Sequence, residues 1–139
     1  MSTSLTPDAA VVTHLAAAGL GLTAGTNLFR GTMRPVAAGV PALAVFVAET
    51  GGPPPVPYID AAVNGDTWHF DVQVMIRGNR ETTAAARTLA RNIRNSLHRA
   101  TITGYLSVVA QQSAPTPLGF DESERPLFSV NVRLVGVDL

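Results

Sequence analysis

The residues in this sequence best suited to chemistry are His69 and Asp71, which lie two positions apart in a strand-like segment. This spacing places both side chains on one strand face, where they could bind a metal ion or act as a base with an orienting carboxylate. The other imidazoles, His14 and His98, stand alone in helical segments, and no HExxH pattern is present. We therefore interpret the pair as polar residues on an exposed strand face and predict no metal site and no cofactor.

Other catalytic motifs are missing from the sequence. It has no cysteine and no GxSxG pattern, so no activated nucleophile is recognisable. The glycine-punctuated segment 19–25 lacks the lysine and the following hydroxyl residue of a phosphate-binding loop. The acidic cluster of Asp121, Glu122 and Glu124 lacks the turn glycine and the distal acid of a calcium loop, which favours a solvated loop. The sequence predicts no catalytic residues and a protein that is not an enzyme.

The strongest charged feature is a helical segment rich in arginine. The chain has ten arginines and no lysine, and ten acidic residues balance this charge. No bulk attraction to membranes or nucleic acid is therefore expected. Helical spacing places Arg87, Arg91, Arg94 and His98 on one face. The simplest interpretation of this arginine face is a solvated surface.

Two other interpretations of the arginine face remain open. Nucleic-acid binding would need exposed aromatic rings beside the arginines, but Trp68, Phe70 and Phe128 fall on apolar strand faces. The other interpretation is pairing with the acidic cluster, within the chain or across a subunit boundary, because the guanidinium group suits interfacial carboxylates.

The composition favours one soluble domain over residues 1–139. With 46% hydrophobic and 14% charged residues, the chain can bury a core without disulfides, and its surplus apolar surface suggests protein partners. Its most apolar stretch, residues 36–48, is shorter than the roughly 20 residues of a membrane span and is interrupted by Gly39 and Pro41. The first residues do not resemble a signal peptide. We expect a cytosolic product with no membrane partner.

Two helices are predicted to position the charged residues. Thr6, Pro7 and Asp8 provide a capping hydroxyl, a first-turn proline and an acid, and Gly19 provides a stop, so a short helix should lie between them. A longer helix is predicted from about Arg80 to Arg99, roughly 30 Å, on a single apolar stripe: Ala86, Leu89, Ala90, Ile93 and Leu97.

Apolar and alternating segments predict strands at residues 27–30, 43–48, 58–63, 67–77, 105–111 and 128–134. Asn64-Gly65 should form a hairpin turn between the third and fourth of these. In the fourth strand, Trp68 and the alternate residues after it form an apolar face. The other face, which includes His69, Asp71 and Arg77, should meet water or another subunit.

Two segments between these strands are predicted to be loops. Residues 50–57 contain four prolines, which should prevent regular pairing, and residues 112–126 form a long polar connection. The predicted fold class is α/β in the α+β sense: a mixed, mostly antiparallel sheet of about four to five strands packed by one long and one short helix. The strand–helix–strand order around the long helix predicts a right-handed crossover.

Three stretches resemble a known family when they are taken together: Gly25–Gly31, Gly51–Pro55, and Pro117–Glu122 running into Arg125–Asn131. In this order, with residues 72–97 between the second and the third, they are similar to the tail terminator or tail-to-head joining proteins of long-tailed bacteriophages, often labelled minor capsid proteins. The resemblance covers nearly the whole chain. The family pattern usually has glycine where this chain has Glu124.

The resemblance implies a structural virion protein of the head–tail junction, made in the host cytoplasm. It implies a small α/β fold assembled as a hexameric ring that caps the tail tube, contacts the head connector and lets the genome pass through its lumen without sequence-specific binding. Another connector component, such as a stopper or an adaptor, remains an alternative. An alternative from another class is a ferredoxin-like ligand-binding module or small ring-forming enzyme with a site at His69, Asp71 or Arg77.

A ring protein needs complementary surfaces and projecting loops, and the sequence offers candidates for both. The subunit contact is hypothesised to join the arginine face of one subunit to the acidic cluster of the next, through Arg87, Arg91, Arg94, Asp121, Glu122 and Glu124. The candidate contact with the tail tube protein or the head–tail connector protein is the stiff loop that contains Pro53, Pro54 and Pro55.

Overall fold

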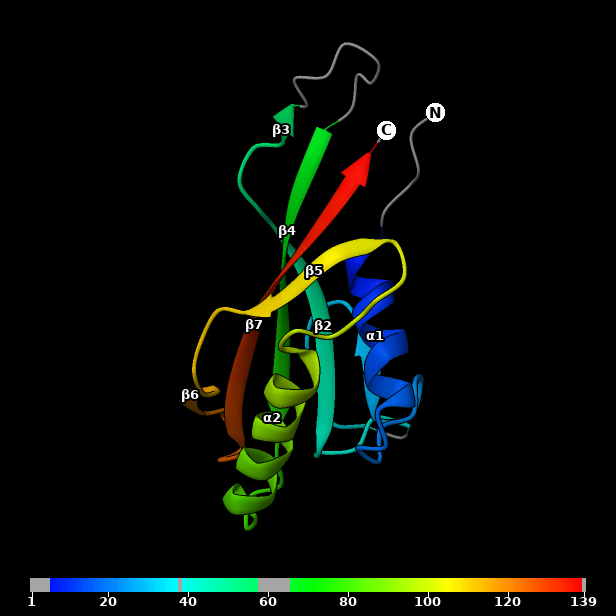
Figure 1. Cartoon of the computed structure of the whole chain (residues 1–139). Coiled ribbons are helices and arrows are strands. Elements are labelled where there is room, and N and C mark those ends of the chain that lie inside the picture. Colours follow the sequence, from blue (N-terminus) through cyan, green and yellow to red (C-terminus); the bar gives the residue numbers. More distant parts are fainter. Residues whose placement is uncertain (1–5, 38, 58–65, 139) are drawn as a thin grey trace.

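The computed structural model describes residues 6–37, 39–57 and 66–138 (Figure 1). Within these residues the chain forms two helices and seven strands. The helices are α1 (Pro7–Ala17) and α2 (Thr83–Leu97). The strands are β1 (Leu28–Arg30), β2 (Ala44–Gly51), β3 (Val56–Pro57), β4 (Asp66–Arg77), β5 (Tyr105–Ala110), β6 (Thr116–Phe120) and β7 (Pro126–Asp138).

All seven strands belong to one sheet, whose main path runs β1-β2-β4-β7-β5. β1 and β2 are parallel, and the other strand pairs among the described residues are antiparallel. The predicted α+β class, with a mixed and mostly antiparallel sheet and two helices, is confirmed. The five main-path strands agree with the expected number, and the short strands β3 and β6 exceed it.

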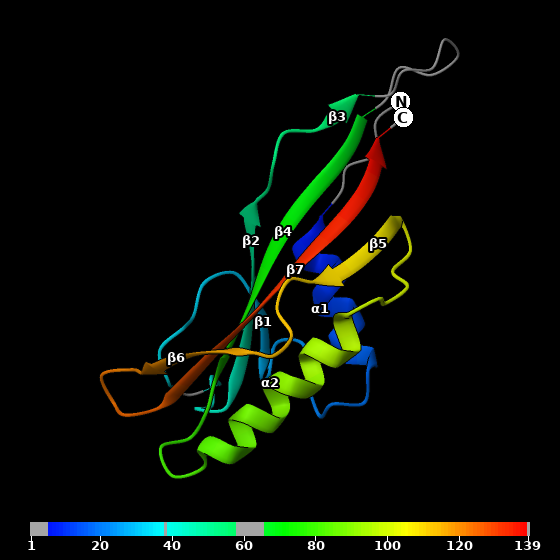
Figure 2. The same cartoon turned by 60° about the vertical axis from the view of Figure 1, so that its left-hand side comes forward.

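β4 and β7 form a long central ribbon. Their register runs without a shift from Asp66 opposite Asp138 to Arg77 opposite Leu127. One end of the ribbon extends past the helices, with β3 beside it (Figures 1 and 2). β5 pairs with the opposite side of β7, so β4 and β5 are parallel strands joined through α2, with β7 between them.

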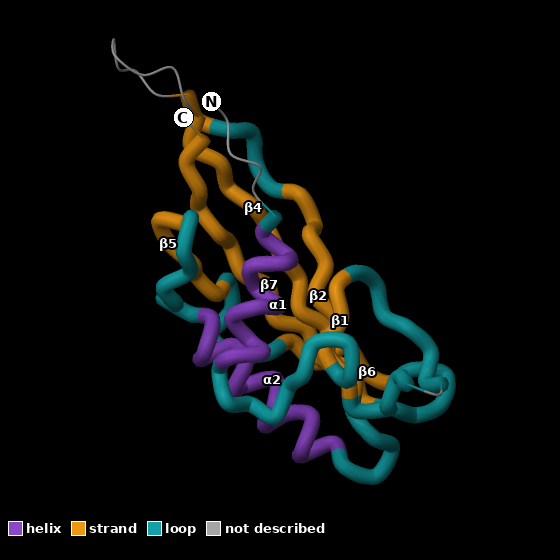
Figure 3. The backbone as a smooth tube through the Cα atoms, turned by 90° about the vertical axis from the view of Figure 1, so that its right-hand side faces the viewer, coloured by secondary structure: helices purple, strands orange, loops and turns teal. Residues whose placement is uncertain are grey.

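Both helices pack in the main core on one face of the sheet (Figure 3). The predicted apolar stripe of α2 is confirmed, because Ala86, Ala90, Ile93 and Leu97 are fully buried and Leu89 packs at the margin. Burying a side chain as large as Leu97 is worth about 1.5–3 kcal/mol. The stripe packs with side chains of α1 and the central strands, which include Val11, Leu15, Val72, Val74, Val130 and Val132.

The helix ends differ in detail from the prediction. α1 begins at Pro7 as expected, but Thr6 makes no side-chain cap, and the Asp8 carboxylate accepts a hydrogen bond from Ala9 N at 2.9 Å. α2 begins at Thr83 rather than Arg80, because residues 79–82 first form a turn. It ends at Leu97, two residues before Arg99 takes a positive φ of 62°.

The opposite face of the sheet carries a second, smaller cluster of Phe29, Ala44 and Phe46. Residues 31–37 and 39–43, here called the strap, run past this cluster between β1 and β2, and Val40 packs against it. The prediction that Arg77 meets water or another subunit was wrong, because only 2% of the residue is exposed and the strap covers it. Its guanidinium group donates hydrogen bonds to the strap.

The two loop predictions were each wrong in part. Val56 and Pro57 form β3, which pairs with Thr67 and Asp66. Thr116–Phe120 forms β6, which pairs with the start of β7. Both strands contain proline, which is tolerated at a sheet edge because an edge residue can leave its nitrogen unpaired. The predicted hairpin partner 58–63 and its turn lie outside the described residues.

Candidate functional site

Asp71 and Arg77 are engaged with different partners, and the buried Nδ1 atom of His69 has no hydrogen-bond partner among the described residues. Asp71 lies opposite Arg133 in the β4–β7 register and accepts a 2.8 Å hydrogen bond from Arg133 Nε, which raises the pKa of Arg133. Gln111 Nε2 donates to the same carboxylate at 3.3 Å. The Asp71 carboxylate is therefore engaged in a cross-strand ion pair. In the part of the chain that the structure describes, no group of three or more histidine or acidic residues is placed to hold a metal ion.

The other two histidines have structural contacts. His14 Nε2 lies 3.1 Å from the Ser96 carbonyl oxygen and so links α1 to α2. His98 Nδ1 accepts a hydrogen bond from Ala110 N at 3.2 Å, while Arg99 N donates to Val108 O at 2.7 Å. Together these two bonds cover the outer edge of β5 at Val108 and Ala110.

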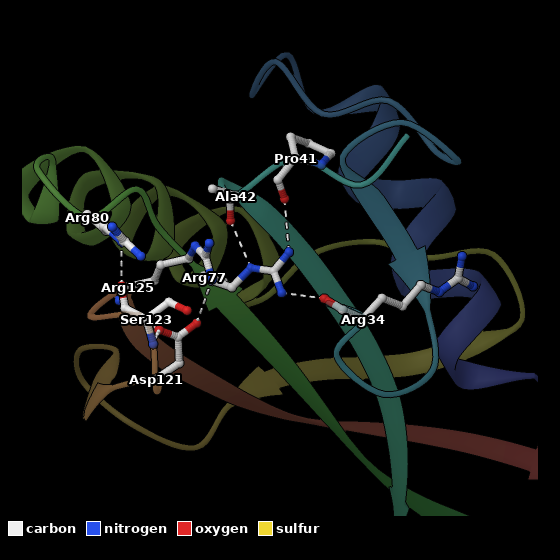
Figure 4. A network of polar contacts seen from close by, with 8 residues as sticks. All are labelled: Arg34, Pro41, Ala42, Arg77, Arg80, Asp121, Ser123 and Arg125. Atoms are coloured by element: carbon white, nitrogen blue, oxygen red, sulfur yellow. Dashed lines mark hydrogen bonds and ion pairs between the residues drawn. The ribbon is translucent and has the colours of Figure 1, made fainter. Parts of the chain in front are cut away.

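Arg77 clamps the strap (Figure 4). Its Nε and Nη2 donate to the carbonyl oxygens of Ala42 and Pro41 at 3.0 and 2.9 Å, and its Nη1 donates to Arg34 O. The guanidinium carbon lies 5.2 Å from the centre of the Phe46 ring, within the range of a cation–π contact. Burial lowers the pKa of Arg77, and the nearby charge of Arg125 lowers it further.

The acidic cluster lies in the turn between β6 and β7 (Figure 4). Asp121 Oδ1 accepts hydrogen bonds from Ser123 N at 2.9 Å and Arg125 N at 2.8 Å, and Asp121 Oδ2 lies 3.4 Å from Arg125 Nη1. These contacts, with the bond from Arg125 N the largest, lower the pKa of Asp121. Asp121 thus shapes its own turn, whereas Glu122 and Glu124 remain exposed.

A shallow hollow of about 510 Å³ separates this turn from the strap. Its strap side is formed by residues such as Met33 and Val36, and its other side by Asp121, Glu122 and Arg125. Arg77 lies in its lining, so the clamp on the strap also fixes the shape of this hollow.

The arginine face of α2 does not pair with the acidic cluster inside the chain. Arg87 lies over the ring of Phe128, 6.0 Å from its centre, and Arg94 Nε donates to Gln112 O at 3.0 Å. Arg91 is exposed. The salt bridges of the described residues join Arg30 to Asp8, Arg125 to Asp121 and Arg133 to Asp71.

The proline-rich loop is exposed and held tightly at its base. Pro53, Pro54 and Pro55 are all exposed. A methyl group on Gly52 would lie 2.0 Å from the carbonyl oxygen of His69, so only glycine fits against β4 there. Thr50 Oγ1 donates to Asp71 O at 3.1 Å and adds a second anchor.

Two surface features were not predicted from the sequence. One is a groove of about 470 Å³ between α2 and the α1–β1 connection. The other is the apolar exposure of β6, where Phe120 is 63% exposed and Leu118 is 45% exposed. The alternation of residues 116–120 could have signalled the second feature, but Pro117 and Gly119 interrupt it. Within the described residues, neither helix has the length and hydropathy needed to cross a bilayer.

The described residues thus form an α+β fold with clamped loops, exposed projections and oppositely charged surfaces. A family model described as bacteriophage tail terminator protein matches residues 14–138, and the chain belongs to this family. It is therefore a structural protein of the virion tail with a role in joining tail and head. The family-level resemblance stated from the sequence is confirmed.

The fold is also found in a solved virion. A chain in the structure of the virion of the native gene transfer agent particle superposes with a TM-score of 0.64 at 17% sequence identity. The match covers 96% of this chain and 95% of that one, so the two share the whole fold. No match was found among curated protein sequences.

Proposed function

We propose that this tail terminator acts as a homo-oligomeric ring, a hexamer, that seats on the end of the tail tube and presents its other side to the head–tail connector protein. The observation that supports a ring is the separation of unlike charges on one chain. Exposed Arg91 and exposed Glu122 and Glu124 have no ion-pair partner among the described residues. A head-to-tail contact between copies would bring such surfaces together, and such contacts generate a closed ring when the rotation between successive copies closes.

The subunit interface proposed here joins Arg87, Arg91 and Arg94 of one copy to the acidic turn of the next. These charged residues are not equally available for contact with another copy. Asp121 already binds Arg125, and Arg87 and Arg94 already contact Phe128 and Gln112. Arg91, Glu122 and Glu124 are free to make most of the contact. The proposed contact with the tube or the connector is the exposed loop of Pro53, Pro54 and Pro55.

The protein would work by contact and not by catalysis. Two of the three residues that could have served an enzyme have other engagements, since Asp71 pairs with Arg133 and Arg77 clamps the strap. The genome would pass through the ring without base-specific binding. We expect no recognition of a particular nucleic-acid sequence because the arginine face lacks the exposed aromatic rings that bind bases.

The test combines mass measurement with electron microscopy. Purified protein is examined by analytical ultracentrifugation and negative staining, alone and mixed with tail tubes. We expect six-fold rings at one end of each tube. A protein that stays monomeric with tubes present, or that decorates tube walls instead of an end, contradicts the proposal.

A further inference from the structure

The groove beside α2 is mostly apolar and has no charged residue in its lining. It lies between the outer side of the helix and the connection from α1 to β1, and its volume is about 470 Å³, within the range of about 300–1,000 Å³ of small-ligand clefts. Small residues of α2 keep it open. Its lining consists of Leu20, Gly21, Leu22, Asn27, Leu43, Ala84, Ala85, Thr88, Leu89 and Asn92.

The β6–β7 hairpin carries an exposed aromatic knob. Phe120 is 63% exposed, although it lies in a strand and pairs with Pro126. The turn that follows is fixed, because Asp121 N donates to Arg125 O at 2.9 Å and the Asp121 carboxylate binds the same turn. A large exposed aromatic side chain on a fixed backbone is typical of an interface anchor, because the backbone loses little conformational entropy when the side chain binds.

Knob and groove lie at opposite edges of the sheet. The groove is lined by Asn27 and Leu43, which come directly before β1 and β2, at one edge of the strand order. Phe120 lies on β6, which pairs with the side of β7 opposite to β4 and so lies at the other edge. They are therefore placed for a head-to-tail contact between two copies of the chain.

The charges beside the two features are complementary. Glu122 and Glu124 follow Phe120 and are exposed. Arg91 is exposed on α2 beside Thr88 and Asn92 of the groove, three residues after the first and directly before the second. We propose that Phe120 of one copy inserts into the groove of the next, which brings Glu122 and Glu124 to Arg91. This inference rests on the proposed ring and adds the apolar anchor of its interface.

Cysteine crosslinking tests the contact directly, because the chain has no cysteine of its own. In the double variant Leu118→Cys with Ala85→Cys, which keeps Phe120 and changes a neighbouring exposed side chain of β6, oxidation should produce a ladder of disulfide-linked species up to the full ring. Each single variant, under the same conditions, should give no species larger than a dimer. The reaction is run on free protein and on protein mixed with tail tubes, so that a ring formed only on the tube is also sampled.

A second experiment removes the anchor. Phe120→Ser should weaken assembly at least about tenfold, as expected for a central aromatic residue of an interface. The matched control is Leu106→Ser, which removes a 70% exposed apolar side chain from β5 and should leave assembly unchanged. Circular dichroism and thermal unfolding check that both variants are folded.

The outcomes separate this inference from the proposed function. One outcome is that rings seat on tubes, that Phe120→Ser assembles normally and that no ladder forms. This result overturns the knob-and-groove contact but still supports the proposed ring. A ladder without binding to tubes supports the contact and contradicts the terminator ring. No ring and no ladder, with tubes present, overturns both.

Discussion

Arg77 determines the conformation of the strap through a single side chain. Its guanidinium group binds three strap carbonyl groups, from Arg34, Pro41 and Ala42, and lies over Phe46. Because the carbonyls come from both sides of residue 38, one side chain fixes two parts of the strap. The strap has little regular structure of its own, so this clamp substitutes for backbone pairing.

Replacing Arg77 should release the strap. We expect Arg77→Met to lower the free energy of unfolding by roughly 2 kcal/mol, because three hydrogen bonds from a charged donor are lost while the side-chain length is kept. Urea unfolding measures this loss, and hydrogen exchange should show faster exchange in residues 31–37 and 39–43. Arg99→Met serves as the control, because Arg99 is exposed, and equal losses in the two variants would contradict the clamp.

Glu124 shows strain at a single residue. It has a positive φ of 61°, a conformation that costs a residue with a Cβ atom about 1–2 kcal/mol and costs glycine little. Glu124→Gly should therefore raise the free energy of unfolding by roughly 0.5–1 kcal/mol after the greater flexibility of unfolded glycine is subtracted. Chemical denaturation is the measurement. Glu122→Gly, without a positive φ at its site, should have the opposite sign.

The stability contributed by the turn that contains Asp121 should decrease in acid. Its folded-state pKa lies below the ordinary value of 3.8, mainly because Arg125 N donates to the carboxylate. The folded state therefore favours the ionised carboxylate. The contribution of Asp121 to the free energy of unfolding is fully present above its pKa in the unfolded chain, and it is lost as the pH falls through its lower pKa in the folded protein. In thermal unfolding from pH 7 to pH 2.5, the stability gap between wild type and Asp121→Asn should narrow below about pH 4. A gap that stays constant across this range would exclude the carboxylate charge as its cause.

The outer edges of β5 and β6 are protected against pairing with a strand of another molecule. On β5 the backbone groups of Val108 and Ala110 are bonded to Arg99 and His98, and β6 contains Pro117 and a register shift. Such edges do not invite strand addition, which guards against uncontrolled sheet growth. Subunit contacts are then left to side chains, in agreement with a knob that enters a groove.

The proline-rich loop depends on how its glycines meet the sheet. Gly52→Ala should lower the free energy of unfolding by roughly 2 kcal/mol or more, because the new methyl group would lie 2.0 Å from His69 O and neither backbone can yield freely. Gly51→Ala is the matched neighbour, with a φ of 94° and open space around it, and should cost about 1 kcal/mol from backbone strain alone. Thermal unfolding of both variants measures the difference, and equal effects would argue against the close approach.

Periodicity was sufficient to predict the long elements. The alternation in β4 and β7 and the apolar stripe of α2 repeat over several periods, so local pattern and burial agree. β3 and β6 were missed because each is short, contains proline and exists only through pairing with a distant strand. Arg77 was assigned to water because alternation places it on the polar face, and nothing local reveals that the strap folds over it. Surface features that need two segments, such as the groove, have no signal in either segment alone.

At the scale of the whole molecule, surfaces of complementary charge and shape lie at different places across the sheet. The knob and the acidic turn occupy one edge, the groove lies toward the other, and Arg91 lies beside the groove on α2. A chain with unlike surfaces at its two edges forms a repeating contact that can close on itself. The proposed ring thus follows from the order of the strands as much as from any single residue.

Charge reversal tests this arrangement. Arg91→Glu should weaken ring assembly by roughly tenfold at low salt, and added salt should then strengthen assembly instead of weakening it, because an attractive pair becomes repulsive at the interface and salt screens the repulsion. Adding Glu122→Arg and Glu124→Arg in the same chain should restore assembly. Sedimentation velocity at two salt concentrations measures both effects. Full assembly of Arg91→Glu alone would show that Arg91 lies outside the interface.

The uninterrupted β4–β7 pairing has a mechanical consequence. Twelve residues of β4 give roughly 40 Å of strand, bonded along its whole length to β7. The end at Asp66 and Asp138 lies past the helices, and the other end holds Arg77 and the turn into β6. Such a ribbon gives a continuous path of backbone hydrogen bonds from its projecting end to the strap clamp and the hairpin, so we expect a load applied at one end to reach the other.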